Sequence, residues 1–173
     1  WGALKTRIYG ELIEDIVDVV PIEFRDSQGA ITGYGESPGN VDSAQRYGIE
    51  LNGTLNLDPI GIKGAKIDLE VSANESRIDD PVTGRPRRIS EENIFYYEID
   101  FRHDIDGTPW SYGFEFNRWT QERYFGLSQF IHPYVEPGMF VVFLSHKDIF
   151  GMKGSVSFIT LATNHENLRR SYF

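Results

Sequence analysis

The sequence predicts an all-β chain, an antiparallel up-and-down meander that forms part of a transmembrane β-barrel with about seven to eight strands present. Three observations predict it. Apolar and polar residues alternate with period two, the clean runs are about ten residues long, and long and short connections alternate along the chain. Alternate connections of a meander lie at the same end of the sheet, so we expect all long loops at one end. A soluble sandwich has no reason to sort its loops in this way.

Seven runs are expected to form strands. The first, residues 4–20, is the longest and least regular, and its β-branched residues favour a strand over a helix. The other six cover residues 46–57, 65–74, 95–102, 110–117, 139–144 and 153–158. A further strand near residues 124–131 would bring the count to eight.

The connections between these runs fall into two classes. The short ones, residues 58–64, 104–109 and 147–151, carry turn residues such as Asp58-Pro59 and Asp106-Gly107. The long ones cover residues 26–45, 75–92 and 121–137. Outer-membrane barrels have this asymmetry, with long loops outside the cell and short turns in the periplasm.

The alternation assigns each side chain to a face, because successive residues of a strand point to opposite sides of the sheet. We expect the apolar side chains to face lipid and the polar ones to line the lumen. The residues predicted to face lipid are Tyr47, Ile49, Leu51, Leu55, Ile67, Leu69, Val71, Phe95, Tyr97, Ile99, Phe101, Trp110, Tyr112, Phe114 and Phe116. Those predicted to line the lumen are Arg46, Glu50, Asn52, Lys66, Asp68, Glu70, Glu98, Asp100, Arg102, Glu115 and Asn117.

Composition narrows the classes of function. The net charge of -9 over 173 residues argues against nucleic acid as a partner, since phosphate binding depends on clustered Lys and Arg. The chain has no Cys, which excludes disulfides and thiolate metal sites. Aromatic residues reach 14%, enough for the interfacial girdles of a barrel, although a β-sandwich core rich in Phe and Tyr would use them equally well. No run approaches the length of a membrane helix.

The candidate chemical groups predict neither an enzyme nor a metal or cofactor site. The four His residues, at positions 103, 132, 146 and 165, lack the short spacing of a metal clamp. Arg102-His103-Asp104 is interpreted as a hydrogen-bonding network beside a turn. The acid pairs at 14–15, 79–80 and 91–92 are interpreted as solvated charge. The basic cluster of Arg85, Arg87 and Arg88 could contact lipopolysaccharide phosphates or an anionic ligand, or could simply be solvated.

Several motifs resemble the C-terminal part of TonB-dependent outer-membrane receptors. They are Tyr47-Gly-Ile-Glu-Leu-Asn-Gly-Thr-Leu55, Asp58-Pro59 with the following residues to Asp68, Asp80-Pro-Val-Thr-Gly84, Phe101-Arg-His-Asp-Ile105 and His146-Lys-Asp-Ile-Phe-Gly151. Their order and spacing match the family from about residue 4 to residue 158. The run Ile159-Thr-Leu-Ala-Thr-Asn164 departs from the Asn-Leu-rich run usual in the family.

The resemblance implies a receptor in the outer membrane of a Gram-negative bacterium. Such receptors are 22-stranded barrels with a plugged lumen, and they import scarce ligands such as metal chelates (siderophores). Residues 1–173 would then be a partial barrel domain without the plug domain and the closing strand. Its partners would be outer-membrane lipid, lipopolysaccharide, a small-molecule ligand and, through the missing segments, the plug and the inner-membrane TonB complex. Because the chain enters a strand pattern at Trp1 with no signal peptide, we expect a longer parent protein.

Two alternatives remain open. The first is a complete small outer-membrane barrel of eight strands with a structural, adhesive or lipid-enzyme role, which requires residues 124–131 to form a true strand. The second is a soluble β-sandwich or calycin-like binding module. It would place Tyr47, Ile49 and Leu51 with Ile67, Leu69 and Val71 in one dry core.

Overall fold

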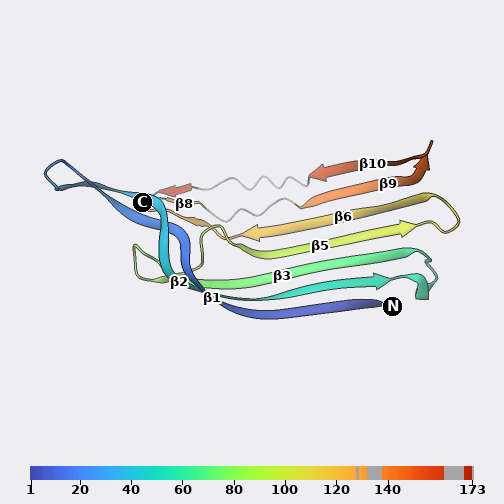
Figure 1. Ribbon diagram of the computed structural model, residues 1–173, viewed down its shortest axis with the longest axis horizontal. Helices are drawn as coiled ribbons and strands as arrows, with labels where there is room; N and C mark the ends of the chain where they lie inside the picture. The colour runs from blue at the N-terminus through green and yellow to red at the C-terminus, as the bar shows by residue number, and fades with distance from the viewer. Residues whose placement is uncertain (128, 132–137, 162–169, 173) are drawn as a thin grey trace.

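The main body of the molecule is one open antiparallel sheet, seen in a computed structural model that describes residues 1–127, 129–131, 138–161 and 170–172 (Figure 1). Its long strands follow one another in chain order, which confirms the predicted all-β meander. They are β1 (Gly2–Arg25), β2 (Ile31–Asn56), β3 (Ala65–Asp79), β5 (Asn93–Asp104), β6 (Trp110–Gln121), β9 (Met139–Ile149) and β10 (Met152–Leu161). The two-residue strand β4 (Pro86–Arg87) pairs with the end of β3. Within the described ranges, β1 pairs only with β2 and β10 only with β9, so the sheet does not close on itself.

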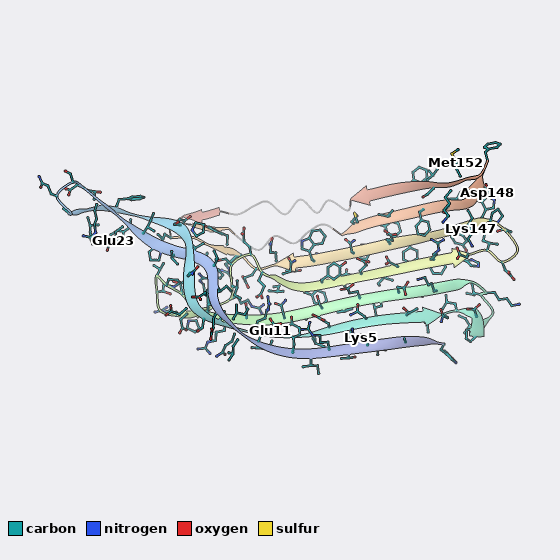
Figure 2. All side chains as sticks on the ribbon, in the orientation of Figure 1. Lys5, Glu11, Glu23, Lys147, Asp148 and Met152 are labelled. Atoms are coloured by element: carbon teal, nitrogen blue, oxygen red, sulfur yellow. The ribbon has the colours of Figure 1, made fainter. Side chains whose placement is uncertain are left out.

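The short connections lie together at one end of the sheet, as the sequence predicts (Figure 1). A single 3₁₀ turn, η1 (Asp58–Ile60), follows β2 and ends at Gly61, whose φ of 94° is the left-handed conformation that glycine adopts without strain. In the β9–β10 turn the Gly151 N–H donates to Asp148 Oδ1 at 2.6 Å. Lys147, Asp148 and Met152 mark this end in Figure 2, whereas Glu23 lies at the opposite end.

The first long connection is not a loop, and here the sequence prediction for residues 26–45 is wrong. β1 and β2 stay paired as far as Arg25 and Ile31, with a register shift after Phe24, and the turn between them covers only residues 26–30. Glycines on β2 carry the loop-like composition, yet they lie opposite bulky residues of β1. Gly33 pairs with Phe24 and Gly35 with Ile22, and a Cβ on Gly35 would lie 2.7 Å from the Phe24 ring. Large side chains of one strand therefore occupy the space that glycine leaves on the other.

The outer part of this hairpin, residues 16–41, is called the hairpin extension. It bends away from the inner parts of β1 and β2 and projects beyond the end of the sheet that lies opposite the short turns (Figure 1). The departure begins near Asp15, whose φ is 53°, between the paired residues Glu14–Ser43 and Ile16–Val41. A non-glycine residue in this region is uncommon and marks a local change in strand direction.

The segment near residues 124–131 does not supply an eighth long strand to the main sheet. β7 (Tyr124–Phe125), β8 (Gln129–Ile131) and β11 (Arg170–Tyr172) form a separate three-stranded sheet in the order β11-β8-β7. Glu36 of the hairpin extension accepts hydrogen bonds from the Tyr124 hydroxyl at 3.1 Å and from the Leu127 N–H at 2.7 Å. These contacts hold the segment beside the hairpin extension instead of beside β6.

The second long connection is shorter than expected, whereas β6 and β9 are separated by a connection as long as predicted. β3 continues to Asp79, and β4 forms within the connection predicted at residues 75–92. Of the run that departs from the family pattern, residues 159–161 belong to β10 and residues 162–164 lie outside the described part of the chain. No helix in the described ranges is long and apolar enough to cross a membrane.

Candidate functional site

The pairing register places every residue predicted to face lipid on one side of the sheet, called the apolar face. One row of directly paired residues crosses six strands of this face: Leu55, Ile67, Phe101, Phe114, Val142 and Phe158. Aromatic rings pack within the face, with ring centroids 5.6 Å apart for Phe101 and Phe114. Such cross-strand contacts stabilise the pairing of neighbouring strands.

The apolar face is exposed across its whole width. Ile8 near one edge is 79% exposed, Val142 is 43% exposed, and Phe158 near the other edge is 73% exposed. A contiguous apolar surface of this extent is far larger than the scattered apolar residues on ordinary soluble domains. Among the described residues, no second layer covers it, so this face is built to meet an apolar medium or another molecule.

All residues predicted to line the lumen lie on the opposite side, called the polar face. Arg7 of β1 donates to Glu50 of β2 at 3.0 Å, and Arg46 of β2 donates to Glu11 of β1 at 2.7 Å. Farther along the face the Thr54 hydroxyl donates to Asp68 at 2.6 Å. These pairs join neighbouring strands by charge-assisted hydrogen bonds.

Carboxylates accumulate in the middle of the polar face. Asp68 pairs in register with Asp100, which in turn pairs with Glu115, and Glu70 pairs with Glu98. The Tyr96 hydroxyl donates to Glu98, and Lys66 contacts Asp68 at 2.6 Å. Like charges placed opposite one another destabilise a sheet in isolation, so this arrangement suits a surface that polar groups or water can reach.

A buried charge cluster fixes the hairpin extension to the loop after β3. The Arg87 guanidinium contacts Asp18 of β1 at 3.1 and 3.3 Å and Asp80 at 2.6 Å. Asp18 also accepts from the Ser90 N–H at 3.0 Å. The Asp18 and Arg87 side chains are only 1% and 8% exposed, so the pair is taken out of water and yet satisfied by several hydrogen bonds.

These contacts decide the protonation of the cluster, which lies beyond the bend at Asp15. Burial alone would raise the pKa of the Asp18 carboxyl, but hydrogen bonds from Arg87, Ser90 and Val19 outweigh it and hold the pKa below its usual value. The same balance holds for Asp80, where burial is outweighed by the Thr83 N–H, Arg87 and the Val82 N–H, and the pKa is again lowered. Both carboxylates are therefore charged at neutral pH.

Two further sets of contacts, made by Glu36 and Glu92, join the long connections to the first three strands. Glu36 holds the segment that contains Tyr124, as described above. Glu92 accepts from the Ser76 hydroxyl and contacts Arg46 at 3.5 Å, which links the connection before β5 to β2 and β3. We call the Asp18–Arg87–Asp80 cluster and the Glu36 contacts together the hairpin clamp.

A pocket of about 360 Å³ lies between the hairpin extension, the loop at residues 80–87 and the segment at residues 125–127. Its apolar walls come from Val19, Val82, Pro86, Phe125 and Leu127, and Arg85 also lines it. The Arg87 guanidinium lies 4.7 Å from the centre of the Phe125 ring at the base of this region. We call this cavity the hairpin pocket.

The candidate chemical groups have structural roles where they are described. His103 contacts the Tyr112 hydroxyl at 3.0 Å and the Lys63 carbonyl at 3.1 Å, which confirms the predicted network beside a turn. His146 packs edge-on against Trp110, with ring centroids 4.4 Å apart. The His residues at positions 132 and 165 lie outside the described part of the chain. No group of three metal-binding side chains occurs among the described residues.

The acidic and basic groups of the long connections are less solvated than the sequence suggests. Asp80 and Glu92, which are interpreted above as solvated, are largely buried and contact Arg87 and Arg46, respectively. Arg87 and Arg88 of the basic cluster are also paired, Arg88 with Glu75 and Glu122, whereas Arg85 stays exposed. The sequence reasoning missed Asp18 and Glu36 altogether. No local signal marks them, because their partners lie 69 and 88 residues away.

None of the protein-family models, curated proteins or solved structures with which the chain was compared matches it. The function is therefore interpreted from two features of the structure itself. They are the apolar and polar faces of the open sheet, and the hairpin clamp at the end of the sheet that carries the longer connections.

Proposed function

We propose that this chain is the barrel portion of an outer-membrane transport receptor of the TonB-dependent type, which imports a scarce ligand such as a metal chelate. The observation that carries the proposal is the contrast between the two faces of a single open sheet. One face is apolar over all seven long strands and exposed. The other is polar and ion-paired from β1 to β6, and at β9 it carries the apolar side chains Val141 and Phe143. Outer-membrane barrels alternate in this way, with lipid outside and a polar lumen inside.

The strand lengths and the ends of the sheet support the same proposal. β5, β6, β9 and β10 have 12, 12, 11 and 10 residues, close to the length with which a tilted strand crosses the hydrocarbon layer. The turns at one end are short, and the opposite end carries the hairpin extension and the residues of the hairpin pocket. In the proposed orientation the hairpin extension faces the outside of the cell.

The alternatives fit these observations less well. A β-sandwich would bury Ile49 and Leu69 against a second sheet, yet they are 39% and 38% exposed on an uncovered face. A complete small barrel needs an even number of spanning strands and paired edges, whereas β1 and β10 are unpaired edges within the described ranges. Unpaired strand edges are costly in a bilayer, so a larger barrel would supply their partners.

The absence of Cys gives a direct test of the lipid assignment. The full chain, reconstituted in phospholipid vesicles, would carry a single bimane fluorophore on Leu69→Cys or, as the matched control from the other face, on Glu70→Cys. Brominated phospholipids are expected to quench the bimane at position 69, and aqueous iodide the bimane at position 70. If brominated lipid quenches neither label, the apolar face does not meet lipid and the proposal fails.

Two further measurements separate the receptor from its alternatives. A self-closed small barrel changes its electrophoretic mobility on boiling, and this chain by itself is expected to show no such change. In cells, loss of the full-length protein is expected to reduce uptake of a radiolabelled iron chelate, and dissipating the proton gradient should have the same effect. Uptake that persists after the gradient is dissipated would exclude the TonB-coupled mechanism.

A further inference from the structure

The hairpin pocket has the size and the lining of a small-molecule site. Its volume of about 360 Å³ is at the lower end of the range for ligand pockets, which is about 300–1,000 Å³. Its walls come from three segments that are far apart in sequence, represented by Val19, Val82 and Phe125. Apolar side chains dominate these walls, as is usual where a ligand is to be removed from water.

Two of the charged residues that line the pocket, Asp80 and Arg87, are already satisfied within the protein. Asp80 Oδ1 accepts from the Val82 and Thr83 N–H groups, both at 2.8 Å, and Asp80 Oδ2 accepts from Arg87. Arg87 also holds Asp18. These contacts make the loop at residues 80–87 a fixed wall, and they leave no free charge on Arg87 for a ligand.

Arg85 differs from its two neighbours in the basic cluster. Its side chain is exposed and lines the pocket. Within the described part of the chain Arg85 forms hydrogen bonds through its backbone N–H and carbonyl, and its guanidinium forms no ion pair or hydrogen bond. A guanidinium at the rim of an apolar pocket can bind a carboxylate through two parallel hydrogen bonds while the rest of the ligand is buried.

We propose that the hairpin pocket binds a small aromatic carboxylate, with the ring against Val82, Phe125 and Leu127 and the carboxylate on Arg85. A volume of about 360 Å³ has room for a single substituted ring. The proposal goes beyond the transport function and does not depend on it, because the pocket is built entirely from the hairpin extension and the adjoining loops.

The test uses two fluorinated probes of nearly equal size. The full chain in detergent micelles is titrated with 4-(trifluoromethyl)benzoate or with the neutral 4-(trifluoromethyl)benzamide, and binding is followed by fluorine NMR after subtraction of the signal from protein-free micelles. The benzoate is expected to bind more tightly than the benzamide. Arg85→Gln should weaken benzoate binding about tenfold, the usual effect of losing one charge-assisted interaction, and leave benzamide binding within about twofold.

Two variants check that the effect belongs to the pocket. Arg77→Gln, at an exposed arginine of β3 that does not line the pocket, is expected to leave both dissociation constants unchanged. Val82→Ser, at a side chain that is 51% exposed and therefore tolerant of change, should weaken both probes alike because it removes apolar contact. Equal binding of benzoate and benzamide, no effect of Arg85→Gln, or no binding beyond that of empty micelles would each overturn the proposal. None of these outcomes bears on whether the apolar face meets lipid, which the quenching experiment decides.

Discussion

The hairpin clamp makes a quantitative prediction about the substitution Asp18→Asn. The Asp18 side chain is 1% exposed and accepts from Arg87, from the Ser90 N–H at 3.0 Å and from the Val19 N–H at 2.6 Å. Removing one partner of a buried ion pair costs about 3–5 kcal/mol. Arg87 keeps Asp80 at 2.6 Å, and the new amide oxygen can still accept a hydrogen bond. The expected cost is therefore smaller, about 2 kcal/mol.

The loss should appear as release of the hairpin extension and not as unfolding of the sheet, because the pairing of β2 from Ala44 onward with β3, and of β3, β5 and β6 with one another, lies outside the extension. The Leu127 N–H is a remote reporter, since it donates to Glu36 on the same hairpin extension at 2.7 Å. When the exchange rate follows the equilibrium between the closed and the open state of this amide, a cost of about 2 kcal/mol makes its hydrogen exchange roughly 30-fold faster. NMR of the chain in micelles measures it directly.

The control is Asp42→Asn, at an exposed carboxylate of β2 that directly follows the hairpin extension and has no hydrogen bond or ion pair to the clamp. It removes the same charge and is expected to leave the exchange of the Leu127 amide unchanged. If Asp18→Asn also leaves the exchange within about threefold of the parent chain, the clamp does not hold the hairpin extension and the reasoning is wrong.

Two more predictions follow from the same structure. The pKa of Asp18 is lowered from 3.8 in the folded chain, so its contribution to stability is present above about pH 4 and is lost as the pH falls through the folded pKa. Exchange of the Leu127 amide, corrected for its intrinsic rate, should therefore rise only below about pH 4, and a rise near pH 6 would contradict the assignment. Gly113→Ala should destabilise the sheet by about 1–3 kcal/mol, because the added Cβ would lie 2.0 Å from the Phe101 carbonyl oxygen. Urea unfolding measures this, with Gly10→Ala, where no atom lies within 4 Å, as the control; equal midpoints for the two variants would contradict the β5–β6 register.

The distribution of side chains between the two faces was predictable from the sequence because it is a local property. In an extended strand, neighbours such as Leu69 and Glu70 point to opposite sides whatever the rest of the chain does. Once each run has one apolar side, pairings shifted by one residue are excluded, since such a slip would mix the two faces. The short turns were equally predictable, because Asp58-Pro59 and Asp148 with Gly151 favour turn conformations whatever their surroundings.

The connections were harder to predict, because their composition is ambiguous. Gly33, Gly35 and Pro38 are typical of loops, and only the partner strand shows that they form a ladder, in which they pair with Phe24, Ile22 and Val19 of β1. Tyr124 and Phe125 are typical of strands, but a carboxylate far away in the sequence, Glu36, determines where this segment lies. In both cases a contact outside the local window overrides the local preference.

The sequence by itself therefore determined the strands, their two faces and the end at which the short turns lie, because strand alternation and turn chemistry act over a few residues. Only the tertiary structure decided that the first hairpin continues beyond the sheet and that Asp18 meets Arg87 across 69 residues. It alone also decided that a pocket forms between the hairpin extension, the loop at residues 80–87 and Phe125. The physical reason is that an acidic residue in an extended strand looks the same in sequence whether water or an arginine solvates it. The bend near Asp15 brings that arginine within reach.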